Sequence, residues 1–397
     1  MTEDRMLHSR WIEVDLDAVA RNVSQVREFL GEGVRLLAVV KSDAYGHGIV
    51  PVARTALAKG ASMLGVTHPE EGMSLREAGI TAPILVFRPL LPGEEEAVLR
   101  YGLTPSVSSL EQAVRLADAG RRYGKRVPVH LKVETGMGRT GLKPAALKEA
   151  AAELFSLAEL EWEGIYTHFA SAAGDPSFTR HQFRVFQEVV RHLAERGVVF
   201  SLRHVCNSAA ALLYPEMRLE MVRVGTLLYG QLPAGVPQNS LELAGTWSFW
   251  ARVLHLQRVQ KGDTVGYGRT HKVRRDTLLA VIPVGYSDGF GIDVSPRPVG
   301  MGDLIKVMGK IVLNYLGFPV GTGYVIINGA SAPVVGRIGM ELSCVDVGKI
   351  PGVEVGTPVL LQARRTVIRA SVPRVYRGEM LPEGSGFQKA PLGDTQM

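Results

Sequence analysis

The sequence of 397 residues contains few features that would direct a protein out of the cell or into a membrane. Its only cysteines, Cys206 and Cys344, lie far apart and without metal-ligand spacing, so we expect neither a disulfide framework nor a metal site. The N-terminal segment is polar and no run of about 18 apolar residues occurs, so neither a secretory signal nor a membrane span is predicted. These absences indicate a cytoplasmic protein.

The charge is modest as well. The net charge is +6 at pH 7, and the basic residues form only short clusters such as Arg121-Arg122. Nucleic-acid binding usually requires a continuous basic stripe, so no nucleic-acid partner is expected. A small excess of positive charge suits an anionic ligand such as a phosphate or a carboxylate. An apolar fraction of 46% and 44 glycines indicate a globular protein with a large core and many tight turns.

Strand-like and helix-like segments alternate through the first part of the chain. A strand-like opening, Trp11–Leu16, runs into a helix pattern that ends near Leu30. Eight short apolar runs then predict strands: Arg35–Lys41, Met63–Thr67, Ile84–Phe87, Leu103–Val107, Val127–Val133, Leu160–His168, Phe200–Cys206 and Met221–Tyr229. Segments between them, such as Leu110–Tyr123, repeat apolar residues every three or four positions and indicate helices. Eight such units predict a closed (β/α)8 barrel with a parallel sheet.

From about residue 241 the pattern changes to strands between glycine and proline turns. Segments such as Thr277–Ile282 and Pro358–Leu361 run apolar or alternate, and helical periodicity is scarce. We therefore predict an α/β protein with a (β/α)8 barrel over residues 12–240 and a mostly β domain over residues 241–378. Residues 1–11 are candidates to pack on the second domain, and the polar residues 379–397 are expected to be disordered.

Reactive side chains stand at the ends of the predicted barrel strands, where ligands of such barrels bind. The first strand ends in Lys41, which is unusual because burying an ammonium group is costly. Other strand ends carry Lys132 with Arg139 nearby, His168, Ser208 and Arg223. Taken singly, His168 or Ser208 fits a structural role better, and Lys41 could simply reach the rim. Together they predict a polar site for a cofactor with a phosphate and a heteroaromatic ring.

Several short motifs follow one another along the chain. They are AVVKSDAYGHG at 38–48, TGMGR at 135–139, YTHF at 166–169, CNSAA at 206–210, MVRVG at 221–225, LYG at 228–230, VGYG at 265–268, IPVGYSDG at 282–289 and GRIGM at 336–340. In this order they resemble the alanine racemases, enzymes that use pyridoxal 5′-phosphate (PLP), over about residues 11–346. The resemblance implies a (β/α)8 barrel, a β domain, PLP as cofactor and interconversion of L- and D-alanine in a homodimer.

The same resemblance implies the cofactor contacts. Lys41 would hold PLP as a Schiff base, His168 would lie by the ring, and Arg223 would bond the pyridine nitrogen. The further cofactor-binding residues are Tyr45, Asn207, Ser208, Gly225 and Thr226, most of them expected at the phosphate. Because arginine only donates hydrogen bonds, the pyridine nitrogen would stay unprotonated and the ring would be a weaker electron sink. This weaker sink favours racemisation over side reactions.

Inversion of a stereocentre requires an acid or base on each face of the cofactor plane. Lys41 would serve one face, and the resemblance implies Tyr267, supplied by the partner subunit, at the other. A strand aromatic packed beside a glycine bulge is the alternative interpretation of Tyr267.

The resemblance also assigns residues around the substrate. Arg139 and Met340 would hold its carboxylate, Met340 coming from the neighbouring subunit, and Tyr286 would line the entrance. Lys132 matches a position that is carbamylated in many members.

Three departures from the family pattern stand out. Glu341 replaces a usual aspartate, and the stretch Phe290–Tyr324 is longer than in many members, so access to the site is expected to differ. Ala370 stands where members carry a tyrosine that reaches the cofactor phosphate. Loss of one hydrogen bond to a charged group costs about 1.5–3 kcal/mol, so PLP binding is expected to weaken roughly ten- to a hundredfold.

Three other functions are alternatives to an alanine racemase. A broad-specificity or other small-amino-acid racemase fits the same residues. A PLP-dependent decarboxylase of this barrel type should carry an acidic partner for the pyridine nitrogen, which is not found. A non-catalytic PLP-binding barrel would resemble the first domain alone. Whether the activity serves D-alanine biosynthesis or catabolism stays open.

Overall fold

The computed structural model describes residues 8–292, 300–315 and 323–378. The chain forms two compact units. One, Asp15–Thr246, is termed the barrel domain; the other, termed the β domain, combines residues 8–14 with the described residues of Trp247–Arg377. Residues 379–397, predicted to be disordered, lie outside the described residues.

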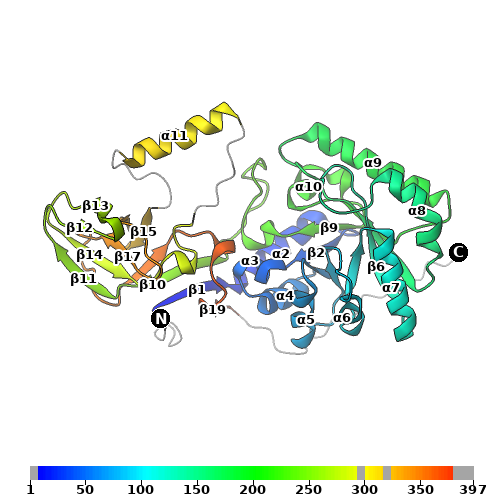
Figure 1. Ribbon diagram of the computed structural model, residues 1–397, viewed down its shortest axis with the longest axis horizontal. Helices are drawn as coiled ribbons and strands as arrows, with labels where there is room; N and C mark the ends of the chain where they lie inside the picture. The colour runs from blue at the N-terminus through cyan, green and yellow to red at the C-terminus, as the bar shows by residue number, and fades with distance from the viewer. Residues whose placement is uncertain (1–7, 293–299, 316–322, 379–397) are drawn as a thin grey trace. The chain divides into compact units, whose positions relative to one another are not determined.

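Eight parallel strands form the centre of the barrel domain (Figure 1). They are β2 (Arg35–Val39), β3 (Met63–Val66), β4 (Ile84–Val86), β5 (Thr104–Val107), β6 (Val127–Lys132), β7 (Leu160–Tyr166), β8 (Leu202–His204) and β9 (Met221–Val224). Each strand pairs with the next in sequence from β2 to β8, and β2 pairs with β9. The N–H of Arg223 donates to the carbonyl of Cys206 at 3.0 Å and joins β9 to the end of β8. The predicted (β/α)8 barrel is thereby confirmed.

Helices pack around these strands, and all of them except α2, which precedes β2, follow a barrel strand (Figure 1). They are α2 (Leu16–Leu30), α3 (Lys41–Gly46), α4 (Ile49–Ala58), α5 (Pro69–Glu77), α6 (Glu95–Arg100), α7 (Leu110–Tyr123), α8 (Pro144–Ser156), α9 (Pro176–Ala194) and α10 (Ser208–Leu213). Side-chain caps begin several of them: Asp15 accepts the Ala18 N–H at 2.7 Å, and Ser109 accepts the Gln112 N–H at 3.2 Å. Each such cap stabilises a helix by about 1 kcal/mol.

A nine-stranded sheet forms the β domain, in the order β11-β14-β17-β16-β15-β18-β10-β1-β19. Its members are β1 (Arg10–Asp15), β10 (Trp247–Arg252), β11 (His255–Val259), β14 (Thr277–Ile282), β15 (Tyr324–Ile327), β16 (Ala330–Val335), β17 (Ser343–Asp346), β18 (Pro358–Leu361) and β19 (Arg374–Arg377). A short ribbon of β12 (Thr264–Val265) and β13 (His271–Lys272) lies apart from it. The predicted mostly β character is confirmed, and β1 pairs with β10, so the first strand of the chain belongs to this domain.

The β domain also contains a helix that the sequence patterns did not predict. Helix α11 (Met301–Tyr315) occupies the middle of the long Phe290–Tyr324 stretch, and its apolar side chains from Met301 to Leu313 are exposed. Residues 293–299 and 316–322 lie outside the described residues, so the expected effect of this stretch on access stays a prediction. None of the helices in the described ranges has the length and apolar character of a membrane span.

Candidate active site

A cavity of about 460 Å³ opens at the carboxyl ends of the barrel strands. Ten of the residues predicted from the sequence line it: Lys41, Tyr45, Lys132, Arg139, His168, Asn207, Ser208, Arg223, Gly225 and Thr226. Arg88 and Phe87 from the end of β4 complete part of the wall. Residues from strand ends that are far apart in the sequence therefore line one cavity, as expected for a (β/α)8 barrel.

Lys41 opens a turn with unusual backbone geometry. The four residues after it, from Ser42 to Tyr45, have φ between 51° and 56°, which is left-handed helical backbone without a glycine. This conformation costs about 1–2 kcal/mol per residue, so surrounding contacts must stabilise it. The turn places both Lys41 and Tyr45 in the cavity wall.

Cationic neighbours dominate the cavity. Burial lowers the pKa of Lys41, the charge of Arg139 lowers it further, and the carboxylate of Glu71 raises it. Burial and then Arg139 lower the pKa of Lys132 to about 8, and the Lys132 Nζ donates to the Thr140 hydroxyl at 2.5 Å. A fraction of Lys132 is therefore the uncharged, nucleophilic amine near neutral pH, and Lys41 loses its proton more readily than an exposed lysine.

Arg223 is the buried centre of the site. One terminal nitrogen donates to the carbonyl and to Nδ1 of His204, both at 2.8 Å, and the other donates to the Thr167 carbonyl at 2.7 Å and to His168 Nδ1 at 3.2 Å. Burial lowers the pKa of Arg223 to about 10, which leaves it protonated at neutral pH. Within the described ranges its Nε–H has no hydrogen-bond acceptor, and no carboxylate pairs with it. One donor thus remains for a ligand in the cavity.

Two buried histidines behind Arg223 were missed by the sequence reasoning. Because His204 Nδ1 accepts from Arg223, its Nε2–H donates to His130 Nδ1 at 2.8 Å. His130 Nε2 then faces the Glu163 carboxylate at 3.6 Å. The tautomers of both rings are thereby fixed from Arg223 outward. The sequence did offer one signal for this pair, because His130 stands two residues before Lys132 in an otherwise apolar strand.

Gly164 makes the room for this pair of rings. A Cβ at Gly164 would lie 2.5 Å from His130 Nδ1, so the His130 ring, which is hydrogen-bonded to His204, would have to shift. Gly164→Ala is expected to destabilise the barrel by about 1–3 kcal/mol through overpacking. The midpoint of thermal unfolding should fall by about 2–4 °C for each kcal/mol of stability that is lost. Gly245→Ala, where a Cβ meets nothing within 4 Å, is the control and should unfold like the unmodified chain.

Small polar groups converge beside Lys41. The Gly225 N–H donates to the Ser208 Oγ at 3.0 Å, which leaves the Ser208 hydroxyl proton for a ligand. The Thr226 Oγ1 is buried without a partner among the described residues, and a Cβ at Gly225 would lie 2.6 Å from the Tyr45 hydroxyl. Asn207 is used differently: its Oδ1 caps α10 through the Ala210 N–H at 3.0 Å. A phosphate fits the chemistry of this corner.

His168 contributes an uncharged ring. Burial, and then the charge of Arg223, lowers the pKa of His168 to about 3. With Nδ1 accepting from Arg223, its Nε2 carries the proton. The imidazole therefore offers a flat, neutral face to the cavity.

The remaining predicted residues lie in the β domain. Tyr267 stands between two glycines of positive φ, and its side chain is 77% exposed, which excludes the alternative of a packed strand aromatic. Tyr286 and Met340 are also exposed, and their segments are hydrogen-bonded together through Tyr286 N–H to the Gly339 carbonyl at 3.0 Å. The described residues contain no cluster of His, Cys, Asp or Glu that could hold a metal ion.

Comparisons with known proteins give one consistent result. The sequence matches the alanine racemase N-terminal domain over residues 14–233 and the alanine racemase C-terminal domain over residues 246–374. It is 37% identical to the alanine racemase of Halothermothrix orenii over 90% of this chain and 88% of that protein. It is 38% identical to the alanine racemase of Desulforamulus reducens over 88% and 89% of the two chains.

Solved structures agree with these sequence matches. The alanine racemase of Clostridium difficile 630 superposes with a TM-score of 0.84 at 29% identity, over 94% of this chain and 97% of that one. The Bacillus anthracis alanine racemase with bound L-Ala-P has a TM-score of 0.81 at 30% identity, over 94% and 96%. The chain belongs to the alanine racemase family.

Proposed function

We propose that Lys41 and Tyr267 of the partner subunit are the two bases with which this chain interconverts L- and D-alanine on PLP. The activity and the cofactor are those of the family. The observation that carries the assignment of the site is the buried Arg223, whose Nε–H is available to the cavity that Lys41 enters.

The residues of the cavity fit the cofactor. PLP, when bound, supplies an electron sink that acidifies the α-C–H of an attached amino acid. The Arg223 Nε–H would donate to the pyridine nitrogen, and the neutral His168 ring would lie against the pyridine ring. The partnerless Thr226 hydroxyl, with Tyr45, Ser208 and Gly225, would hold the phosphate. Asn207 would contribute by capping the helix that carries Ser208.

Substrate binding is assigned to the cationic side of the cavity. Arg139 would bind the alanine carboxylate, with Met340 of the partner subunit beside it. Lys132, with a pKa near 8, would react with carbon dioxide to give a carbamate and a proton. The resulting anion would orient Arg139, whose charge already acts on Lys132.

The second base requires a homodimer, in which Tyr267 of one subunit reaches the cavity of the other. The phenol of Tyr267 is largely exposed on its own chain, as expected of a group that works in another subunit's cavity. Tyr286 would line the entrance to that cavity. The weaker PLP binding expected from Ala370 is part of this proposal, and the cytoplasmic location stays a prediction.

Racemisation of each proteinogenic amino acid, followed by chiral chromatography, tests the function. Alanine is expected to be converted fastest, because the chain belongs to the alanine racemase family. Conversion of many amino acids at similar rates would favour the broad-specificity alternative. Borohydride reduction of the PLP-loaded protein should fix the cofactor on Lys41. Absence of racemisation with every amino acid, or a label on another lysine, would contradict the proposal.

A further inference from the structure

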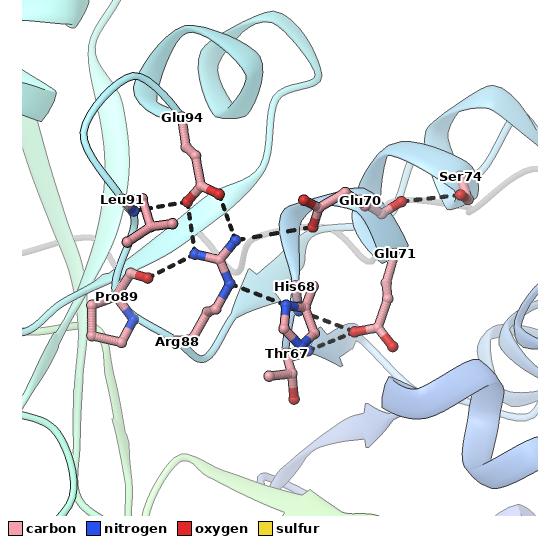
Figure 2. Close-up of polar contacts among 9 residues, drawn as sticks. All are labelled: Thr67, His68, Glu70, Glu71, Ser74, Arg88, Pro89, Leu91 and Glu94. Atoms are coloured by element: carbon pink, nitrogen blue, oxygen red, sulfur yellow. Dashed lines mark hydrogen bonds and ion pairs between the residues drawn. The ribbon is translucent and has the colours of Figure 1, made fainter.

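Glu71 links the ends of two neighbouring barrel strands through one carboxylate. Its Oε1 accepts the backbone N–H of Ser42, the residue after Lys41, at 2.5 Å. Its Oε2 accepts the N–H groups of Thr67 at 2.9 Å and His68 at 3.1 Å, where β3 ends and α5 begins (Figure 2). The turn that carries Lys41 is thereby fastened to the first turn of α5.

The α5 side of this link is itself held firmly. Arg88, at the end of β4, donates from Nε to His68 Nδ1 at 3.2 Å, and both of its terminal nitrogens donate to the Glu94 carboxylate at 2.6 and 2.7 Å (Figure 2). A bidentate arginine–carboxylate pair has little freedom to shift. Glu71 therefore ties the lysine turn, which follows β2, to the ordered groups at the ends of β3 and β4.

The lysine turn requires such a support. Its four left-handed residues are not glycines, and the conformation is unfavourable without external contacts. Asp43 and Ala44 make bonds to neighbouring backbone within the same region, whereas the Glu71 contact reaches the turn at the position directly after Lys41 from another βα unit.

The charge of Glu71 acts on the same lysine. The other charged groups that line the cavity with Lys41 are Arg88, Lys132, Arg139 and Arg223, and His168 is uncharged. Glu71 lies outside this lining, and its charge also acts on Lys41. Burial and Arg139 lower the pKa of Lys41, and Glu71 opposes them. Loss of the carboxylate should move the pKa of Lys41 further down.

We propose that Glu71 is a positioning residue for Lys41, fixing through the Ser42 N–H the left-handed turn that aims the lysine into the cavity. This role rests on the proposed function of Lys41 as the residue that holds PLP. Glu71 itself does not line the cavity and is not a catalytic residue.

Two Glu71 variants separate its effects. Glu71→Gln removes the charge but keeps one oxygen acceptor, and Glu71→Ala removes both. Glu70→Gln and Glu70→Ala are the matched controls, because Glu70 is the adjacent carboxylate, its side chain is 70% exposed, and it lies 4.0 Å from Arg88. Ser109→Ala, which removes the cap of α7 away from the cavity, controls for the loss of a helix cap alone.

The first measurement uses the apoprotein. Competitive labelling of lysines with acetic anhydride across pH, read by mass spectrometry, gives the pKa of Lys41 without cofactor. We expect a lower value in both Glu71 variants and an unchanged value in the Glu70 and Ser109 controls. The second measurement is the PLP concentration that half-saturates borohydride trapping on Lys41. Loss of a charged hydrogen-bond acceptor should raise it roughly tenfold in Glu71→Ala, with a smaller rise in Glu71→Gln.

The outcomes are distinct. If the Glu71 variants only unfold at lower temperature, as Ser109→Ala does, and leave labelling and trapping of Lys41 unchanged, Glu71 is a helix cap and the proposal fails. Equal shifts in the Glu70 variants would also overturn it, because they would show a general charge effect. Trapping of PLP on another lysine in the unmodified protein would instead refute the proposed function, while the pKa of Lys41 in the apoprotein still tests Glu71.

Discussion

Co-expression of the Lys41→Ala and Tyr267→Phe chains is expected to restore racemisation that neither variant has alone. If each site takes Lys41 from one chain and Tyr267 from the other, the mixed dimer contains one site with both bases and one with neither. Two affinity tags allow the mixed dimer to be isolated. Its rate per dimer should be about half that of the unmodified dimer, because two-fold symmetry gives two sites of which one is intact.

A reciprocal pairing carries the same two substitutions in one chain. A dimer of the doubly substituted chain with the unmodified chain should be inactive, since each of its sites then lacks one base. If every site were built from a single chain, the two results would be exchanged, and the shared site would be disproved.

The single Tyr267 variant reports on the individual proton transfers. General acid–base catalysis contributes about 10²- to 10⁴-fold, so Tyr267→Phe should slow racemisation by that factor. Exchange of the α-proton with deuterated solvent should persist for one enantiomer only, because Lys41 still serves its own face. Tyr123→Phe, at another exposed tyrosine, should leave both exchange rates unchanged.

Replacement of Arg223 by glutamate is expected to change the reaction as well as its rate. Removal of one preorganised electrostatic contact typically costs about 10²- to 10³-fold in turnover, and racemisation should fall at least that far. A carboxylate beside the pyridine nitrogen favours its protonated form and makes the ring a stronger electron sink. Transfer of the amino group of alanine to PLP, with release of pyruvate, should then become detectable.

Arg203→Gln is the matched control for this experiment. Arg203 lies on the adjacent strand β8, and its partner Glu220 is on the loop before β9, away from the cavity lining. Arg203→Gln should leave the rate of racemisation and its product unchanged. Arg223→Lys keeps the positive charge with fewer donors and should lose activity without forming pyruvate. A folded Arg223→Glu protein that racemises alanine normally would show that Arg223 does not set the reaction type.

The sequence was sufficient to predict the barrel and most of its cavity. Lys41 and His168 follow apolar strands and Arg223 lies near the end of one, and the parallel barrel brings such positions together. The hydrogen bonds that orient these residues were not predictable in the same way. His130 pairs with His204 across two strands, and Glu71 reaches Ser42 from another helix, so neither contact has a local sequence signature.

Two local features were missed for different reasons. The left-handed turn after Lys41 contains ordinary residues, and only the surrounding contacts specify it. Helix α11 did carry a signal, because Leu304, Met308 and Ile311 recur at helical spacing. The glycines and prolines of the stretch around it favoured a β interpretation instead.

The position of β1 in the sheet has a consequence for synthesis of the chain. Its partner strands β10 and β19 begin only at Trp247 and Arg374, so β1 is synthesised long before either of its neighbours in the sheet. In the sequence, the residues of the barrel domain lie between β1 and β10. Domains fold as units from the N-terminus during translation, so the barrel is complete while β1 still lacks a partner. The nascent protein therefore carries β1 as an unpaired strand until β10 is made, and one edge of β1 stays open until β19 follows, so that Arg10–Asp15 can pair with other chains during this interval.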